Sequence, residues 1–287
     1  MQVIRCSQDM LDWPSSLKRA FVPTMGALHN GHLALLREAR QECEEVVVSI
    51  LVNPLQFGTD EDFASYPRTL ERDLELCHEA GVDIVFCPLA SDIYHPAFDT
   101  RICGGWLAKQ YCGVSRPIFF EGVLTVVNIL FNLVRPNRAY FGEKDFQQLF
   151  LIQKMVRDLW IPVHIVGVPV VRESNGLALS SRNAYLTREQ RQEASCLYQA
   201  ICTVRESVLE GEKSIDTLRK IALKQISLEL DYLEFVSEIS LKPIEGFVSE
   251  NVRLLIAAYI GNKPRVRLID NGIVSDSNAC QLGNRSL

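Results

Sequence analysis

The sequence predicts an α/β fold, a doubly wound (Rossmann-like) parallel sheet followed by a second, smaller α+β domain. Residues 46–52 and 82–86 are apolar on both alternating faces, as strands covered by helices on both sides must be. Segments of helical periodicity alternate with such strands through the first half of the chain, which is the pattern of a doubly wound sheet. The length of 287 residues suits one large and one smaller domain, which we place at 1–174 and 175–287.

The elements of the large domain follow from local composition and periodicity. Strands are expected where Val, Ile and Phe gather in short runs, and helices where apolar residues recur every three or four positions. The expected strands are 19–22, 46–52, 82–86, 138–141 and 162–171, and the expected helices are 33–43, 67–80, 123–133 and 146–159. Each of the first four strands therefore leads into a helix, which makes the sheet parallel.

The smaller domain begins where the sequence pattern changes, after residue 175. Thr187 and Gln190 fit a capping box, which predicts a long helix from there to about Leu209. The remaining elements are expected to be a helix at 214–230 and three strands at 232–239, 252–259 and 266–269. The tail after Asn271 is polar, and we expect it to be loosely held.

Composition excludes several classes of function. Hydrophobic residues make up 47% and charged residues 23% of the chain, as in ordinary globular proteins. The net charge of -5 argues against a nucleic-acid-binding surface. The start lacks the apolar core of a signal peptide and no apolar run is long enough to span a membrane, so we expect a cytoplasmic protein with no membrane partner. Nine cysteines without a C-x-x-C pair fit reduced thiols better than disulfides or a zinc site.

The segment FVPTMGALHNGH, residues 21–32, places two histidines and two glycines where an apolar strand turns into a helix. We expect free backbone N–H groups at this helix start, which would attract an anion. His29 and His32 lie three residues apart, so both rings can face the crevice beyond the strand ends. The alternatives are an incidental surface position and a metal site, although zinc needs a third ligand for which no matching motif is present.

The H-x-G-H pattern of this segment resembles the H-I-G-H signature of nucleotidyltransferases and class I aminoacyl-tRNA synthetases. The resemblance implies that the histidines stabilise an α-phosphate under attack. Imidazole N–H donors suit the charge that adenylyl transfer places on phosphorus oxygens.

The segment LSSRN, residues 179–183, occupies the domain junction where that superfamily carries its mobile K-M-S-K-S-like loop. Its hydroxyls and guanidinium suit the β- and γ-phosphates. An ordinary Ser-rich linker is the alternative.

Two further polar positions follow predicted strands. Lys144 in FGEKD places a point charge at the same crevice, while Asp145 suits the first turn of a helix. A solvated helix start is the alternative there. Gln56 in NPLQFG offers both a donor and an acceptor to a small polar substrate, although a turn amide is the commoner use of such a residue.

Five segments in order resemble the pantothenate synthetases, the pantoate–β-alanine ligase family: VPTMGALHNGH, VNPLQFG, FGEKDFQQ, VPVVRESNGLALSSRN and RLIDN. The resemblance extends from residue 22 to residue 271. It implies ATP-dependent condensation of (R)-pantoate with β-alanine through a pantoyl adenylate, with release of AMP and pyrophosphate. It also implies Mg²⁺ accompanying ATP, a homodimer, and a small domain that acts as a lid.

The resemblance assigns site residues by position. Gln56 corresponds to a contact with pantoate and β-alanine, and Gln148 to a second contact with pantoate. His32 corresponds to the proton donor. The implied catalytic residues are His29, His32, Lys144, Ser180, Ser181 and Arg182. The implied ATP site consists of Met25, Gly26, Ala27, Leu28, His29, Asn30, Gly31, His32, Gly142, Glu143, Lys144, Asp145, Val171, Leu179, Ser180, Ser181 and Arg182. The magnesium ligands are not identified.

The chain departs from the family pattern at two positions. The family's R-P-G-H-F-x-G-V reads RPIFFEGV here, so Phe119 replaces a histidine, and V-V-x-K-L-F-N reads VVNILFN, so Ile129 replaces a lysine. Loss of one transition-state donor costs roughly 10²–10³ in turnover. Arg116 is a candidate for compensating the missing histidine. The alternatives are another nucleotidyltransferase of the superfamily, against which Gln56 and Gln148 argue, and a catalytically weakened nucleotide-binding descendant.

Overall fold

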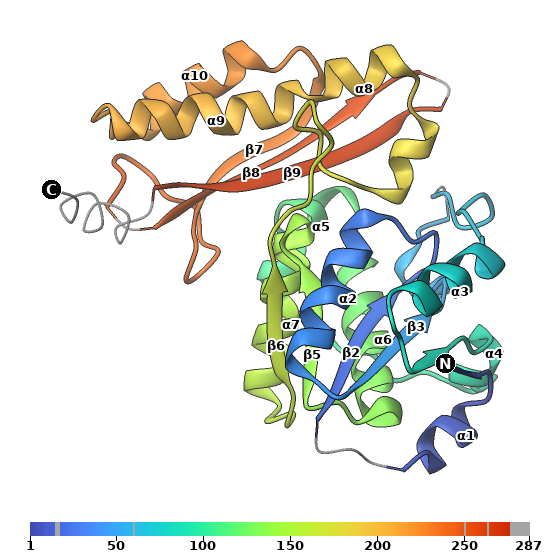
Figure 1. Ribbon diagram of the computed structural model, residues 1–287. Helices are drawn as coiled ribbons and strands as arrows, with labels where there is room; N and C mark the ends of the chain where they lie inside the picture. Colours follow the sequence, from blue (N-terminus) through green and yellow to red (C-terminus); the bar gives the residue numbers. More distant parts are fainter. Residues whose placement is uncertain (15–17, 60, 250, 263, 276–287) are drawn as a thin grey trace, which may run out of the picture. The chain divides into compact units, whose positions relative to one another are not determined.

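The computed structural model describes residues 1–14, 18–59, 61–249, 251–262 and 264–275 (Figure 1). The chain divides into two compact units, Met1–Val171 and Arg172–Leu287. The first unit is built on a parallel sheet and the second on an antiparallel one, which confirms the predicted fold class.

The first unit contains a six-stranded parallel sheet with strand order β1-β4-β3-β2-β5-β6. Its strands are β1 (Gln2–Ile4), β2 (Arg19–Thr24), β3 (Glu45–Ile50), β4 (Ile84–Phe86), β5 (Arg138–Gly142) and β6 (His164–Val168). From β2 the chain moves outward through β3 and β4, and it then crosses to β5 and β6 on the other side. The strand order therefore reverses between β2 and β5, and such a switch point is where open α/β sheets bind ligands.

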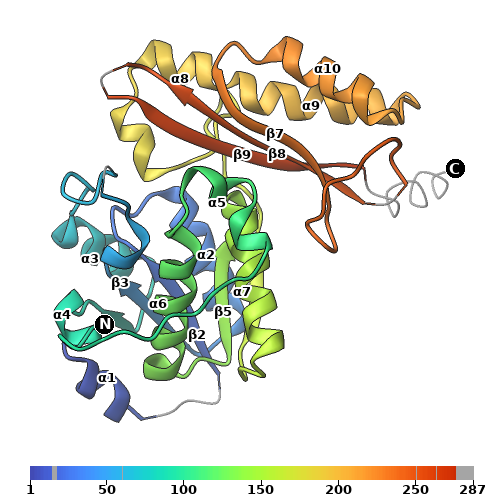
Figure 2. The same cartoon turned by 180° about the vertical axis from the view of Figure 1, so that it is seen from behind.

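Helices cover both faces of this sheet. Figure 1 shows α2 in front of the strands and α6 behind them, and Figure 2 shows the reverse. The helices are α1 (Ser7–Asp12), α2 (Asn30–Glu42), α3 (Leu70–Glu79), α4 (Ala90–Ile93), α5 (Cys112–Ser115), α6 (Phe119–Val134) and α7 (Phe146–Asp158). Short 3-10 turns are η1 (Pro54–Gln56), η2 (Leu107–Lys109) and η3 (Glu143–Asp145). None of the helices in the described ranges combines the length and apolar character that crossing a membrane requires.

The second unit packs helices on a three-stranded antiparallel sheet of order β7-β8-β9. The elements are η4 (Ser181–Tyr185), α8 (Arg188–Ala194), α9 (Cys196–Leu209), α10 (Ile215–Gln225), β7 (Glu229–Ser237), β8 (Val252–Ile260) and β9 (Val266–Ser275). Leu197 and Leu218 of the helices share one apolar core with Phe235 and Ile256 of the strands. This unit therefore has a hydrophobic core of its own.

The structure corrects several predicted boundaries. The predicted capping box at Thr187 and Gln190 is present, but the long helix is interrupted at Ser195 and forms α8 and α9. The Ser195 hydroxyl donates to the Gln192 carbonyl at 2.7 Å, and the Ser195 N–H bonds that same carbonyl, which tightens the turn. The tail prediction was partly wrong, because β9 continues to Ser275, and the rest of the tail lies outside the described residues. The edge strand β1 and helix α1 were not predicted.

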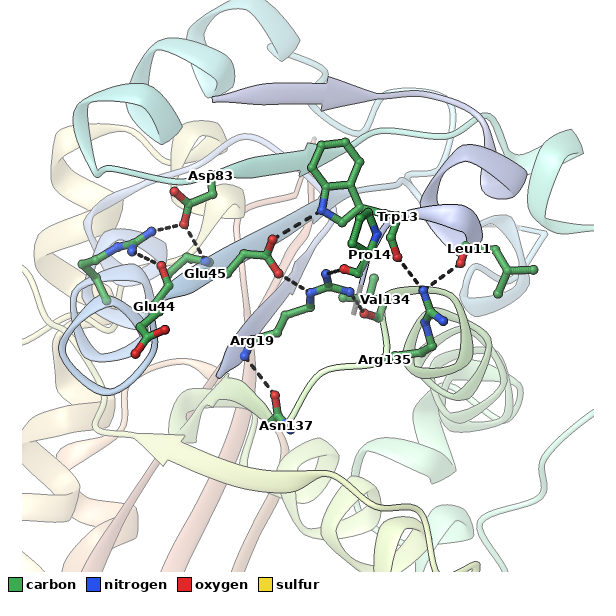
Figure 3. A network of polar contacts seen from close by, with 12 residues as sticks. Leu11, Trp13, Pro14, Arg19, Glu44, Glu45, Asp83, Val134, Arg135 and Asn137 are labelled. Atoms are coloured by element: carbon green, nitrogen blue, oxygen red, sulfur yellow. Dashed lines mark hydrogen bonds and ion pairs between the residues drawn. The ribbon is translucent and has the colours of Figure 1, made fainter. Parts of the chain in front are cut away.

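A polar network closes the amino end of the parallel sheet (Figure 3). The Arg19 side chain is 0% exposed, and its Nε donates to Glu45 Oε2 at 2.5 Å. Its two remaining nitrogens donate to the Val134 and Pro14 carbonyls. Trp13 Nε1 reaches the other Glu45 oxygen at 3.3 Å. The network thus ties the end of α6 and the segment after α1 to β2 and β3.

Candidate active site

The predicted site segments of the first unit lie at the carboxyl ends of neighbouring strands. β2 ends at Thr24, and residues 25–29 lead from it into α2. β5, which pairs with β2, ends at Gly142 and is followed by Lys144 in η3. The two segments therefore flank the switch point of the sheet.

The turn after β2 adopts a conformation that favours glycine. Gly26 has a φ of 82° and Ala27 a φ of 50°. The Thr24 hydroxyl accepts the Gly26 N–H at 3.1 Å and donates to the Ser49 carbonyl at 2.7 Å, so the turn is anchored to β3. A Cβ on Gly26 would lie 3.0 Å from Asp73 Oδ2, closer than real Cβ contacts allow without a shift. Glycine thus serves both the positive φ and the close approach.

The backbone amides of this turn bond within the protein. Asp73, in the first turn of α3, accepts the Ala27 N–H at 2.9 Å and the Leu28 N–H at 2.8 Å. Ala27 and Leu28 precede α2, so the prediction of free amides at the helix start does not concern them. Asp73 lies 46 and 45 positions away from these two residues in the sequence, so no local pattern could have revealed the bonds.

The two histidines cap the start of α2 through their rings. His29 Nδ1 accepts the Gly31 N–H at 3.1 Å, and His32 Nδ1 accepts the His29 N–H at 3.2 Å. A nitrogen that accepts a hydrogen bond carries no proton, so the ring proton of each neutral imidazole lies on Nε2. The ring centroids lie 4.1 Å apart. The pair therefore carries two Nε2–H donors side by side.

Both rings are neutral at physiological pH. Burial, assisted by the charge of Lys144 and opposed by Asp145, lowers the pKa of His29 to about 4. Burial, assisted by His29 and by the charge of Lys144, lowers the pKa of His32 to about 3. Since Lys144 acts on both rings, the structure brings these three predicted residues together. The Lys144 side chain is 18% exposed, and its Nζ lies 3.7 Å from Asp145 Oδ2.

The alternative of a metal site at the histidine pair finds no support in the described residues. Among them, no group of three His, Cys, Asp or Glu side chains could hold a metal ion. Of the two nearby charges, Lys144 acts on both rings and Asp145 only on His29, and the Lys144 cation repels metal ions and attracts phosphate. The donor set of this site therefore fits an anionic ligand.

Gln56 lies beside the turn, 6% exposed, with its amide held in one orientation. Its Oε1 accepts from Asn53 Nδ2 at 3.0 Å, and its Nε2 lies 3.1 Å from the Met25 sulfur. Asn53 also donates to the Gly122 carbonyl at 3.1 Å and accepts the Tyr94 hydroxyl at 2.7 Å. Asn53 thus fixes which end of the Gln56 amide faces Met25. The sequence analysis did not identify this role, although Asn53 belongs to the NPLQ segment.

The two adjacent glutamines at the start of α7 differ in their surroundings. Gln147 is buried, accepts the Cys112 N–H at 3.1 Å, and donates to the Leu107 and Gln110 carbonyls. The side-chain amide of Gln147 thus holds the segment from Leu107 to Cys112 through three hydrogen bonds. Gln148 is only half-buried. This difference favours Gln148 as the glutamine that a ligand can reach.

The position where the family pattern has histidine forms a stacked cluster. Phe119 lies under the Arg116 guanidinium, whose carbon is 3.7 Å from the ring centroid. Arg116 donates to both Glu61 oxygens, at 2.7 and 2.6 Å, and to the Gln56 carbonyl at 3.2 Å. Its charge is therefore balanced by Glu61, and it supports the backbone of Gln56. The hypothesis that Arg116 compensates the missing histidine at an anion gains no support from these contacts.

The second departure lies away from the first. Ile129 is ten residues beyond Phe119 on α6, which corresponds to about 15 Å along the helix axis. Phe119 is at the end of α6 that lies near Gln56 through Arg116. The two substitutions therefore lie about three turns apart on one helix.

Residues 179–182 belong to the second unit, where neighbouring side chains brace them. The Ser180 hydroxyl accepts the Arg182 N–H at 3.3 Å. The buried Asn183 donates its N–H to the Ser180 carbonyl at 3.0 Å and its side chain to the Ala178 carbonyl at 3.0 Å. Arg191 donates to the Asn183 carbonyl at 2.8 Å. These bonds hold the predicted phosphate-binding loop in a defined form. The LSSRN motif contains Asn183, but nothing in the sequence pattern indicated this bracing role.

Comparisons with known proteins agree on one family. Residues 2–273 match the family model described as pantoate-beta-alanine ligase. The protein named pantothenate synthetase in Trichlorobacter lovleyi is 47% identical over 286 residues, covering 96% of this chain and 100% of that protein.

Two solved structures share the fold over the same range. Pantothenate synthetase from Thermus thermophilus has a TM-score of 0.90 and 46% identity, and covers 96% of this chain and 99% of its own. A pantoate-beta-alanine ligase from Francisella tularensis, complexed with beta-gamma ATP and beta-alanine, has a TM-score of 0.77 and 34% identity, and covers 96% and 98%. Fold, ordered site segments and full-length similarity together show that the chain belongs to the pantoate–β-alanine ligase family.

Proposed function

We propose that this chain condenses (R)-pantoate with β-alanine in two steps that use ATP. The pantoate carboxylate attacks the α-phosphorus, the bond to the β-phosphate oxygen breaks, and pyrophosphate leaves. The β-alanine amine then attacks the acyl carbon of pantoyl adenylate, loses a proton, and AMP leaves. Adenylation is needed because a free carboxylate resists attack by amines. Orientation and charge stabilisation suffice for this route, so it needs no nucleophilic side chain.

The observation that carries the proposal is the pair of Nε2–H donors beside Lys144 at the switch point. Negative charge builds on the α-phosphate oxygens and on pyrophosphate during adenylation. Donors already oriented toward that charge stabilise the transition state without reorganisation. The neutral rings keep this role over a wide pH range. Bound polyphosphate would raise the pKa of His32, which allows a protonated ring only in the ATP complex.

Gln56 and Gln148 are proposed to hold pantoate. The Gln56 Nε2 group now faces the Met25 sulfur, a weak acceptor. A pantoate hydroxyl or carboxylate is a stronger acceptor and can replace it. Asn53 retains the amide orientation during this exchange, because its side chain donates to the Gln56 Oε1 and not to the Nε2 group that pantoate would meet.

The remaining assignments extend the proposal to the second unit. Val171 and Leu179 are proposed to contact the nucleotide, and Ser180, Ser181 and Arg182 the β- and γ-phosphates. The smaller domain, 175–287, would then act as a lid, and the chain would function as a homodimer. Mg²⁺ enters as part of the MgATP substrate, held by phosphate oxygens and water.

Pyrophosphate chemistry tests each half-reaction. Pantoate alone should support exchange of labelled pyrophosphate into ATP, whereas sustained release of pyrophosphate should require pantoate and β-alanine together. Sustained release that ignores β-alanine would favour another nucleotidyltransferase of the superfamily. Binding of ATP without exchange or release would favour a nucleotide-binding descendant that has lost the activity.

A further inference from the structure

Asp73 is a buried carboxylate that none of the catalytic assignments uses. It lies in the first turn of α3 and is 1% exposed. Its Oδ2 accepts the Ala27 N–H, and its Oδ1 accepts the Leu28 N–H and the Thr69 hydroxyl at 3.2 Å. Within the described ranges, no Lys, Arg or His side chain forms an ion pair with it. Its charge is therefore stabilised by the backbone amides of the turn at residues 25–28 and by the N-terminus of α3.

A carboxylate suits this position because two successive amides point at it. Each of its oxygens accepts one N–H, so both amides are satisfied at once. An asparagine offers one oxygen, and its NH₂ group would face the second N–H, donor against donor. The carboxylate thus requires the backbone to present Ala27 and Leu28 together, which the positive φ values of Gly26 and Ala27 achieve.

The same turn sets the geometry of the imidazoles. Residue 29 follows Leu28 directly and is the N-cap of α2, where its ring accepts the Gly31 N–H. Its own N–H fixes the His32 ring. The positive φ of Ala27, a non-glycine residue, is costly unless surrounding contacts hold it. Asp73 supplies contacts of this kind from an element remote in sequence.

We infer that Asp73 is a positioning residue, which holds the turn at residues 25–28 so that the Nε2–H groups of His29 and His32 are oriented before ATP arrives. The expected fall in kcat/KM rests on the proposed function, whereas the expected change in the orientation of the two imidazole rings does not. Asp73 does not touch the reacting atoms, because its oxygens are occupied by the turn and by Thr69. Its effect is exerted through the backbone.

Asp73→Asn tests the inference against a control carboxylate in Asp83→Asn, which is 44% exposed and also pairs with Arg40. Asp83 also accepts a backbone N–H, from Val46 at 2.8 Å, but at the amino end of the sheet. Misplacement of a catalytic donor by about 1 Å can cost 10²-fold, so we expect Asp73→Asn to lower kcat/KM for ATP roughly 10- to 100-fold. Asp83→Asn should change it less than about twofold. Equal effects of the two variants would overturn the inference.

A spectroscopic readout separates positioning from general stability. Nitrogen-15 NMR of the ligand-free protein should show His29 and His32 protonated only at Nε2, and Asp73→Asn should mix the tautomers while Asp83→Asn does not. Unchanged ring signals in folded Asp73→Asn would overturn the inference. Should that variant fail to fold, Thr69→Val removes one bond to the carboxylate and should shift the signals and kcat/KM in the same direction, by roughly two- to fivefold in rate. No shift in either quantity would overturn it.

These experiments keep two failures apart. A wild-type protein without pyrophosphate exchange would refute the proposed function and leave the NMR comparison valid. An active wild-type protein whose Asp73→Asn variant has unchanged kinetics and ring signals would refute the role of Asp73 alone.

Discussion

The two ends of the parallel sheet use charged groups in opposite ways. At the amino end, the Arg19 guanidinium is fully buried and makes three bonds, to Glu45 and two carbonyls, so its charge is fully engaged within the fold (Figure 3). At the carboxyl end, Lys144 acts on two neutral imidazoles whose Nε2–H groups remain donors. Charge is therefore neutralised within the fold at the amino end, the stabilising end, whereas the carboxyl end, the proposed reactive end, keeps hydrogen-bond donors.

Arg19→Met should break the stabilising end. The substitution keeps much of the side-chain length but leaves Glu45 Oε2 and the Val134 carbonyl without the donors that Arg19 supplies. Removing one partner of a buried pair costs about 3–5 kcal/mol, so the free energy of unfolding in urea should fall by that amount. The kcat/KM of the folded variant should stay within about twofold of wild type. Lys18→Met, at an exposed neighbouring pair with Glu44, is the control and should leave the midpoint unchanged.

His32→Ala should break the reactive end. Loss of one preorganised donor should lower kcat roughly 10²–10³-fold, or about 2.7–4 kcal/mol. Loss of the ring that caps the His29 N–H should lower the free energy of unfolding by only about 0.5–2 kcal/mol, so the protein stays folded. The measurement is pyrophosphate release with both substrates. His164→Ala, at the amino end of β6, is the control and should retain full activity. Activity of His32→Ala within threefold of wild type would contradict the proposed role.

Low pH should destabilise the protein through the carboxyl end of the sheet, because the two described histidines with lowered pKa values, His29 and His32, lie there. The unfolded chain protonates its histidines near pH 6.5, whereas the folded chain protonates His29 only near pH 4 and His32 near pH 3. The unfolded state therefore binds more protons between these values, so the free energy of unfolding falls as the pH drops below 6.5. At pH 5 the free energy of unfolding should be lower by about 1–2 kcal/mol per imidazole. Above about pH 7 the histidines should not change it.

Urea titrations at several pH values measure this loss, and the double variant His29→Gln/His32→Gln should lack it. The working form is the neutral ring, so kcat/KM should stay level from pH 8 to pH 6. A decline that begins above pH 6 as the pH rises would instead assign the activity to imidazolium.

Phe119→His should have the smallest effect. The ring at this position stacks on Arg116, whose cation would keep a histidine neutral, and Arg116 still supports the Gln56 carbonyl. We expect kcat to change by less than about threefold and KM for pantoate to rise slightly as the stacking weakens. Ile129→Lys, farther along α6, is the control and should have no effect. A rise of 10²-fold in kcat would show that the family's histidine is a donor this chain lacks.

Much of the fold could be predicted from sequence, since it depends on local signals. Apolar runs identified β3 and β4, and helical periodicity identified α2 and α7, each within a few residues. The three-residue edge strand β1 carries too little pattern to be found. The interruption at Ser195 was also missed, because a serine in mid-helix is ordinary until its hydroxyl bonds a specific carbonyl.

The candidate site was less accessible from sequence. The resemblance to the family supplied the residues that face a ligand, including His29, His32 and Lys144. It did not supply those that hold them, such as Asp73, which lies 46 positions from Ala27, and Asn53, which holds Gln56 while bound to the Gly122 carbonyl 69 positions away. The neutral state of the rings also depends on burial, which no motif encodes. Contacts between residues remote in sequence therefore decide the orientation and the protonation state of the two histidine rings.

The reciprocal ring caps at the start of α2 have one further consequence, for selectivity between ligands. A transition metal needs an unprotonated imidazole nitrogen, and on both rings that nitrogen already accepts a backbone N–H. To chelate zinc, the pair would have to exchange tautomers and open the first turn of the helix. A histidine pair held in this way therefore disfavours metal chelation, whereas its Nε2–H groups stay available as hydrogen-bond donors.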